Sequence, residues 1–180
     1  PDRGLEELLN MWPLIRKSMP EATLKIFYGW EYFNTSLHIP AQRTFKERIR
    51  ELIQQNGVEW GGRIGQDLLP NELAQADAII YPPHPFRETY GIAFLEAQAA
   101  GVICFYRENG ALGETIGNRG VALKMDATPE QIVEIIARTL QNKPYCDNVR
   151  ERARQYGMMR SWDGQADKLL SLFRRLNDGS

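Results

Sequence analysis

Apolar positions along this chain alternate between helical spacing and short continuous runs. Near the N-terminus they recur at i, i+3, i+4 and i+7, at Leu5, Leu8, Leu9, Trp12 and Ile15. This spacing predicts an amphipathic helix that ends by Pro20. A run of mostly apolar residues, 24–28, follows directly and predicts a strand.

The same alternation continues to the end of the chain. Further helices are expected at residues 45–53, 70–75, 92–100, 128–140, 147–156 and 162–176. Further strands are expected at residues 58–63, 78–81, 102–106 and 121–123. The uninterrupted run Val102–Tyr106 is typical of a strand covered on both faces. Strands separated by helices imply crossover connections. The sequence therefore predicts an α/β fold, a Rossmann-like parallel sheet with helices on both faces.

Two C-terminal segments carry more specific helix signals. Thr128 followed by Pro129 and Gln131 combines an N-cap, a proline at the first helical position and a capping box. In the last helix one face is apolar, and we expect it to join the core. That face consists of Trp162, Ala166, Leu169, Leu170, Phe173 and Leu176.

Composition narrows the class of protein. The 180 residues suit one domain, and 43% hydrophobic content is typical of a globular chain. The net charge of −1 and the absence of basic runs argue against nucleic-acid binding. No apolar stretch is long enough to cross a bilayer. Two cysteines suit a reducing cytosol, and Cys104 is expected in the core. The first residue is not Met, so we interpret the chain as a fragment.

The segment between residues 81 and 96 is the strongest candidate for chemistry. Prolines stiffen this loop, and Gly91 stands where a helix is expected to begin. In open parallel sheets ligands bind beyond the carboxyl ends of the strands, where helix N-termini offer unpaired N–H groups to anions. These features indicate a phosphate-binding junction. Arg87 and Arg107 could each reach phosphate, but we expect both to be solvated.

Two carboxylates accompany this junction. Glu88 precedes the expected helix, and Glu96 lies inside it, about 7–8 Å along the axis from Gly91. A carboxylate can accept two hydrogen bonds from a ribose diol. Glu96 also stands among apolar residues, where a carboxylate needs a partner. The spacing alone nevertheless leaves two explanations open, a nucleotide site or ordinary solvated acids near a helix start.

The segment Glu88-Thr-Tyr-Gly-Ile-Ala-Phe-Leu-Glu96 resembles the E-x7-E signature of retaining, family 4 (group 1) glycosyltransferases of GT-B architecture. Ordered similarity to the donor domain of this family extends over most of the chain. It includes residues 1–5, 76–83, 109–116, 118–121 and 161–163.

The resemblance implies a role for each matching position. Glu96 would hold the ribose hydroxyls, and Glu88 would contact the transferred sugar or its leaving phosphate. Arg3, where the family usually has Lys, would face the diphosphate, so Glu88 and Arg3 would be the catalytic residues. The backbone of the loop would meet the diphosphate and the sugar at Thr89, Tyr90, Gly91 and Ile92.

Contacts to the nucleoside are implied in a separate segment. The backbone near Arg63 and Ile64 would contact the base, and Leu69 would pack by the nucleoside. The family often has Lys at the position of Leu69, which puts a charge contact there in doubt. No Asp-x-Asp and no cluster with metal-ligand spacing occurs, so we expect neither a metal nor another cofactor.

Residues 1–180 would then form the C-terminal donor-binding domain, lacking its first strand and the N-terminal acceptor domain. The full protein would be a hexosyltransferase-type enzyme that moves a sugar from a nucleoside diphosphate sugar to an acceptor with retention of configuration. We expect the fragment alone to be inactive. The expected location is the cytoplasm. Peripheral association of the full protein with a membrane is the alternative. Two alternatives are a non-catalytic nucleotide-binding or interaction module on the same fold, and a nucleotide-sugar epimerase.

Overall fold

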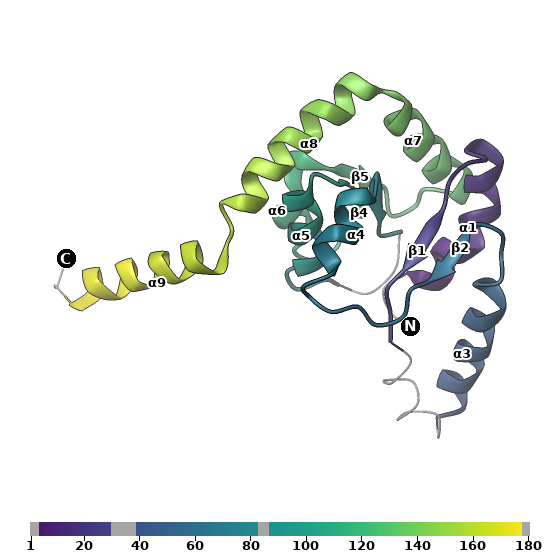
Figure 1. The fold of residues 1–180 in the computed structure, drawn as a ribbon, viewed down its shortest axis with the longest axis horizontal. Coiled ribbons are helices and arrows are strands. Elements are labelled where there is room, and N and C mark those ends of the chain that lie inside the picture. The colour runs from purple at the N-terminus through teal and green to yellow at the C-terminus, as the bar shows by residue number, and fades with distance from the viewer. Residues whose placement is uncertain (1–3, 30–38, 83–86, 178–180) are drawn as a thin grey trace.

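The computed structural model of the chain describes residues 4–29, 39–82 and 87–177. The predicted helices and strands follow one another in the expected order (Figure 1). Two short helices between residues 112 and 119 were not predicted. The helices are α1 (Leu5–Ser18), α3 (Pro40–Leu52), α4 (Leu69–Gln75), α5 (Ile92–Ala100), α6 (Leu112–Ile116), η1 (Gly117–Arg119, a 3₁₀ turn), α7 (Pro129–Gln141), α8 (Lys143–Met158) and α9 (Trp162–Asn177). The strands are β1 (Leu24–Ile26), β2 (Val58–Trp60), β3 (Ala78–Ile80), β4 (Ile103–Arg107) and β5 (Val121–Leu123).

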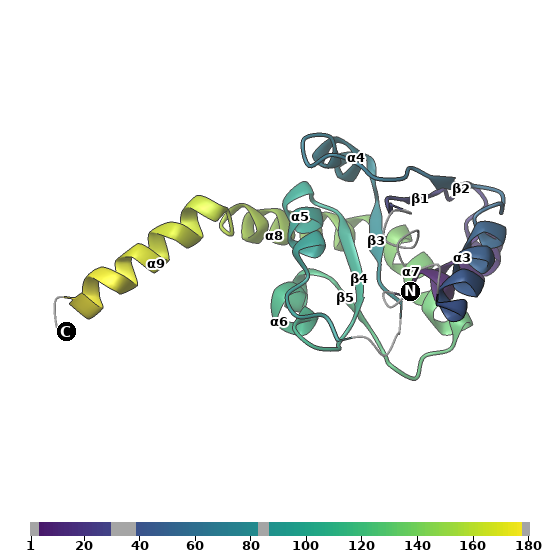
Figure 2. The same cartoon turned by 90° about the horizontal axis from the view of Figure 1, so that it is seen from below.

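All strand pairings between these elements are parallel, which confirms the predicted α/β class. The strands form two groups, β1–β2 and β3–β4–β5. The smaller group lies on the β3 side of the larger one (Figure 2). Within the described part of the chain, β1 and β3 are not paired with each other, so each has one open edge.

Strand β4 divides the core into two layers, and all five of its residues are buried. Ile103 and Phe105 point toward a cluster that includes α1, α7 and α8. Cys104 and Tyr106 point the other way, toward α5 and α6. Helices therefore cover both faces of the sheet, as the uninterrupted apolar run predicts.

Local signals correctly placed the start of α7. Thr128 accepts from the Gln131 N–H at 3.3 Å, and the Gln131 side chain accepts from the Thr128 N–H at 2.9 Å. The predicted capping box is therefore confirmed. It fixes where α7 begins and presents Ile132 and Ile136 to the core.

The expectation that the last helix joins the core is wrong. Helix α9 forms over the predicted residues, but none of its residues is buried. It projects away from the body of the domain (Figure 1), and Trp162 and Leu176 are 80% and 67% exposed. Periodic spacing establishes that a helix has an apolar face, but not which neighbour covers that face.

Candidate functional site

The start of α5 requires a glycine. Gly91 has φ +83°, in the left-handed region, and is the N-cap of the helix. A Cβ at this position would lie 2.6 Å from Leu112 Cδ2, so the Leu112 side chain would have to shift to admit one. The loop can therefore turn sharply into α5 while α6 packs directly beneath it. The first N–H groups of α5 remain available to an anion.

Glu88 is held firmly at the entrance of this junction. Its side chain is buried, and its carboxylate accepts from the Thr89 N–H at 3.1 Å. Its carbonyl accepts from the Ala111 N–H at 2.8 Å, next to a parallel bridge with Gly110. Gly110 has φ +75°, and a Cβ there would collide with the Glu88 carbonyl oxygen. The turn before α6 thus fixes the position of Glu88.

Glu96 lies one helical turn beyond Ile92 and on the same side of α5. Its side chain is half-buried, and burial raises the pKa of its carboxyl group. Among the described residues, the Glu96 carboxylate has no hydrogen-bond or ion-pair partner. The partner that the apolar surroundings led us to expect is therefore not supplied by this part of the chain.

The other predicted contact residues lie on separate elements. Arg63 is exposed and Ile64 is half-buried in the segment after β2, and Leu69 is the half-buried first residue of α4. Helix α4 packs against α5, so Leu69 belongs to a helix next to the one that begins after Gly91. Thr89, Tyr90 and Ile92 are exposed. No contact between these groups and a ligand is tested by the structure, so their roles remain predictions.

The predicted catalytic residue Arg3 lies outside the described residues. The next residue, Gly4, is the N-cap of α1, with φ +76°. A Cβ on Gly4 would lie 2.8 Å from Pro82 Cγ, so α1 begins in tight contact with the segment that follows β3. The N-terminus of α1 and the carboxyl end of β3 therefore meet at one edge of the sheet.

The expectation of a solvated Arg107 is wrong, whereas Arg87 is exposed as predicted. Arg107 ends β4 and is only 1% exposed. Burial lowers the pKa of its guanidinium, while Tyr81 and Glu7 oppose that shift. The arginine follows four apolar strand residues, and the strand's alternation turns it inward beneath α1. Sequence analysis missed this buried charge because a strand end gives no sign of what packs on it.

Three further features bear on function in the described part of the chain: a reactive cysteine, a metal site and a membrane-spanning helix. Cys104 is buried as expected, and burial raises the pKa of its thiol to about 12. In residues 4–29, 39–82 and 87–177, no three His, Cys, Asp or Glu side chains come together as a metal site would require. Within the same ranges, no helix combines the length and apolarity needed to span a bilayer.

Parallel strands with helices on both faces define an α/β domain of the doubly wound, Rossmann-like class. Residues 1–156 match the family described as "Glycosyl transferases group 1". The chain belongs to this family.

A curated relative is the GDP-mannose-dependent alpha-(1-6)-phosphatidylinositol monomannoside mannosyltransferase of Mycobacterium tuberculosis. It is 26% identical over 185 residues, which cover 97% of this chain and 45% of the relative. The chain therefore spans less than half the length of this mannosyltransferase.

Solved glycosyltransferase structures share the fold. Sucrose-phosphate synthase from Thermosynechococcus elongatus superimposes with a TM-score of 0.77 at 18% identity, over 99% of this chain and 43% of its own. A glycosyltransferase from Rickettsia africae gives a TM-score of 0.74 at 19% identity, over 100% of this chain and 46% of its own. The Anabaena protein HepE, solved with UDP and glucose, gives 0.69 at 18% identity, over 95% of this chain and 45% of its own.

Proposed function

We propose that this chain is the donor-binding half of a retaining glycosyltransferase that uses a nucleoside diphosphate sugar. The observation that carries the proposal is the junction at Gly91, where an open helix N-terminus stands between the buried Glu88 and the half-buried Glu96. None of the described residues pairs with the Glu96 carboxylate. Two similar proteins support the donor class, since one is described as GDP-mannose-dependent and another was solved with UDP and glucose.

In this proposal the diphosphate lies at the start of α5. The N–H groups of Gly91 and Ile92, with Arg3, stabilise the negative charge of the departing diphosphate without a metal ion. Glu96 lies further along the helix and accepts hydrogen bonds from the ribose hydroxyls. Glu88 contacts the sugar or its phosphate, and its burial keeps it in one orientation.

The nucleoside extends toward the segment after β2. The backbone at Arg63 and Ile64 contacts the base, and Leu69 at the start of α4 packs beside the nucleoside. The packing of α4 against α5 supports this placement, because it brings the two binding segments together. Thr89 and Tyr90, which are exposed residues, complete the contacts to the diphosphate and the sugar.

The open strand edges support the idea that the sheet is completed by a further strand. Inserting a parallel strand between β1 and β3, ahead of α1, would give six strands in the order 3-2-1-4-5-6 of a doubly wound sheet. The tight contact of Gly4 with Pro82 places the beginning of α1 beside the carboxyl end of β3. A strand that leads into α1 would therefore lie next to β3, in the open position.

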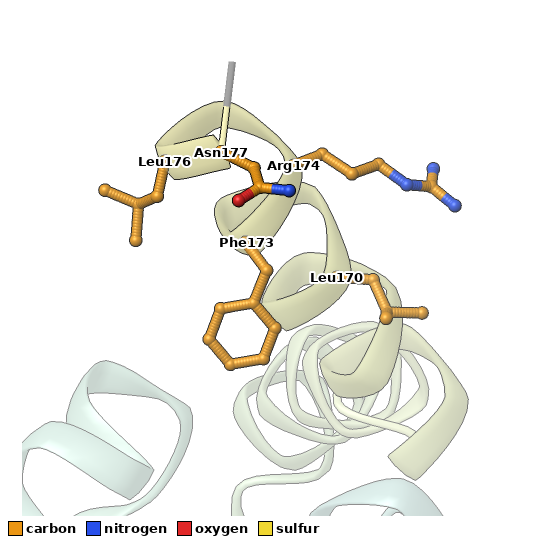
Figure 3. A pocket seen from close by; sticks show the side chains of 5 residues that line it. All are labelled: Leu170, Phe173, Arg174, Leu176 and Asn177. Carbon is orange, nitrogen blue, oxygen red and sulfur yellow. The ribbon is translucent and has the colours of Figure 1, made fainter. Parts of the chain in front are cut away.

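The exposed face of α9 supports a second half of the protein. Leu170, Phe173 and Leu176 line a shallow hollow on this helix (Figure 3). We propose that the acceptor-binding domain covers this face and holds the acceptor against the donor. A cytoplasmic location, with peripheral membrane contact by the whole protein, belongs to the same proposal.

Calorimetric titration of UDP, GDP and ADP tests the donor site. At least one of them should bind with equal affinity in EDTA and in magnesium. Strict metal dependence, or no binding at millimolar concentration, would overturn the proposed site. Assaying the chain together with the acceptor domain tests the epimerase and non-catalytic alternatives. Sugar transfer to an acceptor supports the transferase proposal. Epimerisation of the donor, or binding without any reaction, contradicts the transferase proposal.

The 180-residue chain by itself should transfer no sugar, because positioning of the acceptor supplies about 7–11 kcal/mol of such a barrier. A mixed donor and acceptor panel, followed by released nucleotide and product mass, measures this. Robust turnover would show that the acceptor site lies within these residues and that the two-half proposal is wrong.

A further inference from the structure

A buried polar network lies directly beneath the proposed donor loop. Thr115 of α6 is 5% exposed and Gln98 of α5 is 0% exposed. The Thr115 hydroxyl donates to the Tyr90 carbonyl at 2.6 Å. The Gln98 Nε2 donates to the Thr115 carbonyl at 3.2 Å and to the Phe94 carbonyl at 3.3 Å. The network therefore joins α5 and α6 to the residue just before Gly91.

An arginine continues the network away from the loop. Arg119 Nε donates to Gln98 Oε1 at 3.1 Å, and Arg119 Nη2 donates to the Thr115 carbonyl at 3.2 Å. The guanidinium carbon of Arg119 lies 3.5 Å from the centre of the Tyr156 ring, on α8. Arg160 also lies over this ring, at 4.7 Å. Hydrogen bonds and ring contacts thus connect α8 to the donor loop.

We propose that the Thr115–Gln98–Arg119 network positions the peptide between Tyr90 and Gly91, so that the Gly91 N–H faces the donor diphosphate. This inference rests on the proposed function. The three residues act through the loop backbone and are positioning residues, not catalytic ones.

The planarity of the peptide group gives the physical reason. In a trans peptide the carbonyl and the N–H point in opposite directions, so fixing the Tyr90 carbonyl also fixes the Gly91 N–H. Thr115 holds that carbonyl toward α6. The Gly91 N–H then points away from α6, and it has no acceptor among the described residues.

The hydrogen bond from Thr115 to the Tyr90 carbonyl matters because Gly91 is intrinsically flexible. A glycine at φ +83° has many accessible backbone conformations, and loop geometry alone does not select one. The peptide between Glu88 and Thr89, two peptides earlier, is fixed differently. Ala111 holds the Glu88 carbonyl, and the Thr89 N–H is already occupied by the Glu88 carboxylate. Of these two peptides, only the one held by Thr115 has an N–H without an acceptor among the described residues.

The test compares two substitutions at Thr115. Thr115→Val keeps the shape and removes the hydroxyl, whereas Thr115→Ser keeps the hydroxyl. Thr44→Val is the matched control, since the Thr44 hydroxyl donates to the Pro40 carbonyl at 3.3 Å in an exposed turn of α3. Affinity for UDP, GDP and ADP is measured by calorimetry, and backbone order by hydrogen–deuterium exchange in residues 88–95.

We expect Thr115→Val to bind the preferred nucleotide about three- to tenfold more weakly than Thr115→Ser, with Thr44→Val equal to the parent. Exchange should accelerate at residues 88–95 in Thr115→Val alone. Equal affinity of the two Thr115 variants would overturn the inference. So would an acceleration spread evenly over α5, α6 and β4, because that indicates general destabilisation.

A second pair of variants tests the remote part of the network. Arg119→Lys should weaken nucleotide binding about two- to threefold, because one amine cannot replace both guanidinium hydrogen bonds. Arg160→Lys is the control, since both arginines lie over Tyr156 but only Arg119 donates to Gln98. Equal effects of the two would contradict a network through Gln98. If the parent binds none of the three nucleotides, the proposed function fails, and the exchange measurements still decide the positioning role.

Discussion

Helices α5 and α9 are both rich in apolar residues, yet the rest of the chain surrounds only the first. Helix α5 packs against α4, α6, α8 and β4, and its Phe94 is 6% exposed. Helix α9 has no buried residue, and its Phe173 is 55% exposed. The two helices differ in the distribution of their side chains. The apolar residues of α5 are distributed around the whole helix, whereas α9 has one apolar face and one charged face.

The polar residues of α5 and α9 differ in the same way as the two helices. On α5 only Glu96 and Gln98 are polar. One is a half-buried carboxylate in the proposed site, and the other is the centre of a buried network. On α9 the charged residues Asp163, Asp167, Lys168, Arg174 and Arg175 are exposed. A polar side chain on a helix enclosed by protein therefore indicates a hydrogen-bonding or binding role, because burying a polar group without a partner is costly.

Truncating one phenylalanine on each helix tests the comparison most strongly. Phe94→Ala should lower the free energy of unfolding by about 3–5 kcal/mol, because it leaves a cavity beside Tyr81. Phe173→Ala should change it by less than about 0.5 kcal/mol. Urea denaturation followed by circular dichroism measures both. An equal loss in Phe173→Ala would show that α9 packs on the domain.

Neutralising Glu96 tests its proposed contact with ribose. Glu96→Gln should weaken nucleotide binding by about 1–3 kcal/mol, the range for a lost hydrogen bond to a charged group, without lowering the melting temperature. Glu134→Gln on α7, at an exposed position, is the control and should bind as the parent does. Unchanged affinity in Glu96→Gln would remove this residue from the site. Calorimetry and thermal unfolding provide the two measurements.

The glycines of the two helices should respond in opposite directions to alanine. Gly91→Ala should destabilise the domain by about 1–2 kcal/mol, because φ +83° is left-handed and the new Cβ meets Leu112. Gly164→Ala should raise helicity and stabilise α9 by up to about 1 kcal/mol, since it lies within that helix and its Cβ would meet only Ser161 Oγ at 3.3 Å and the Met159 carbonyl oxygen at 3.7 Å. Circular dichroism during thermal unfolding distinguishes the two. Stabilisation by Gly91→Ala would contradict the strained cap.

The smallest expected effect is the pH dependence caused by Glu96. Burial raises its pKa in the folded state, so the folded protein favours the protonated carboxyl more than the unfolded chain does. Stability should therefore be greatest below the unfolded pKa and should fall as the pH rises through the folded pKa. Glu96→Gln should show a smaller fall between pH 4 and pH 7. Urea unfolding at both values measures it, and identical pH profiles would show that burial does not perturb this group.

Much of the fold was predictable because its signals are local. The spacing of Leu8, Trp12 and Ile15 correctly predicted α1 and its buried face. The apolar run of β4 correctly predicted a strand covered on both sides. The turn at Gly91 and the position of Glu96 inside a helix were also predictable, since a glycine before a helical pattern marks its start.

The surroundings of the site were not predictable in the same way. Thr115 and Ala111 fix the carbonyls of Tyr90 and Glu88 from more than twenty positions further along the chain. Nothing in the local sequence of α6 indicates these partners. Hydrogen bonds between distant segments depend on how two helices cross, and neither periodicity nor propensity contains that information.

The sequence by itself determined the order of the longer helices and the strands, though not the short helices α6 and η1. It also determined the parallel α/β class and the junction at Gly91, because these depend on residues within a few positions of one another. Only the tertiary structure decided that Arg107 is buried, that the face of α9 is exposed and that Thr115 of α6 holds the loop before α5. Each of these depends on which distant segment covers a side chain. Burial is a property of the packed chain, and a residue's neighbours in sequence do not fix its neighbours in space.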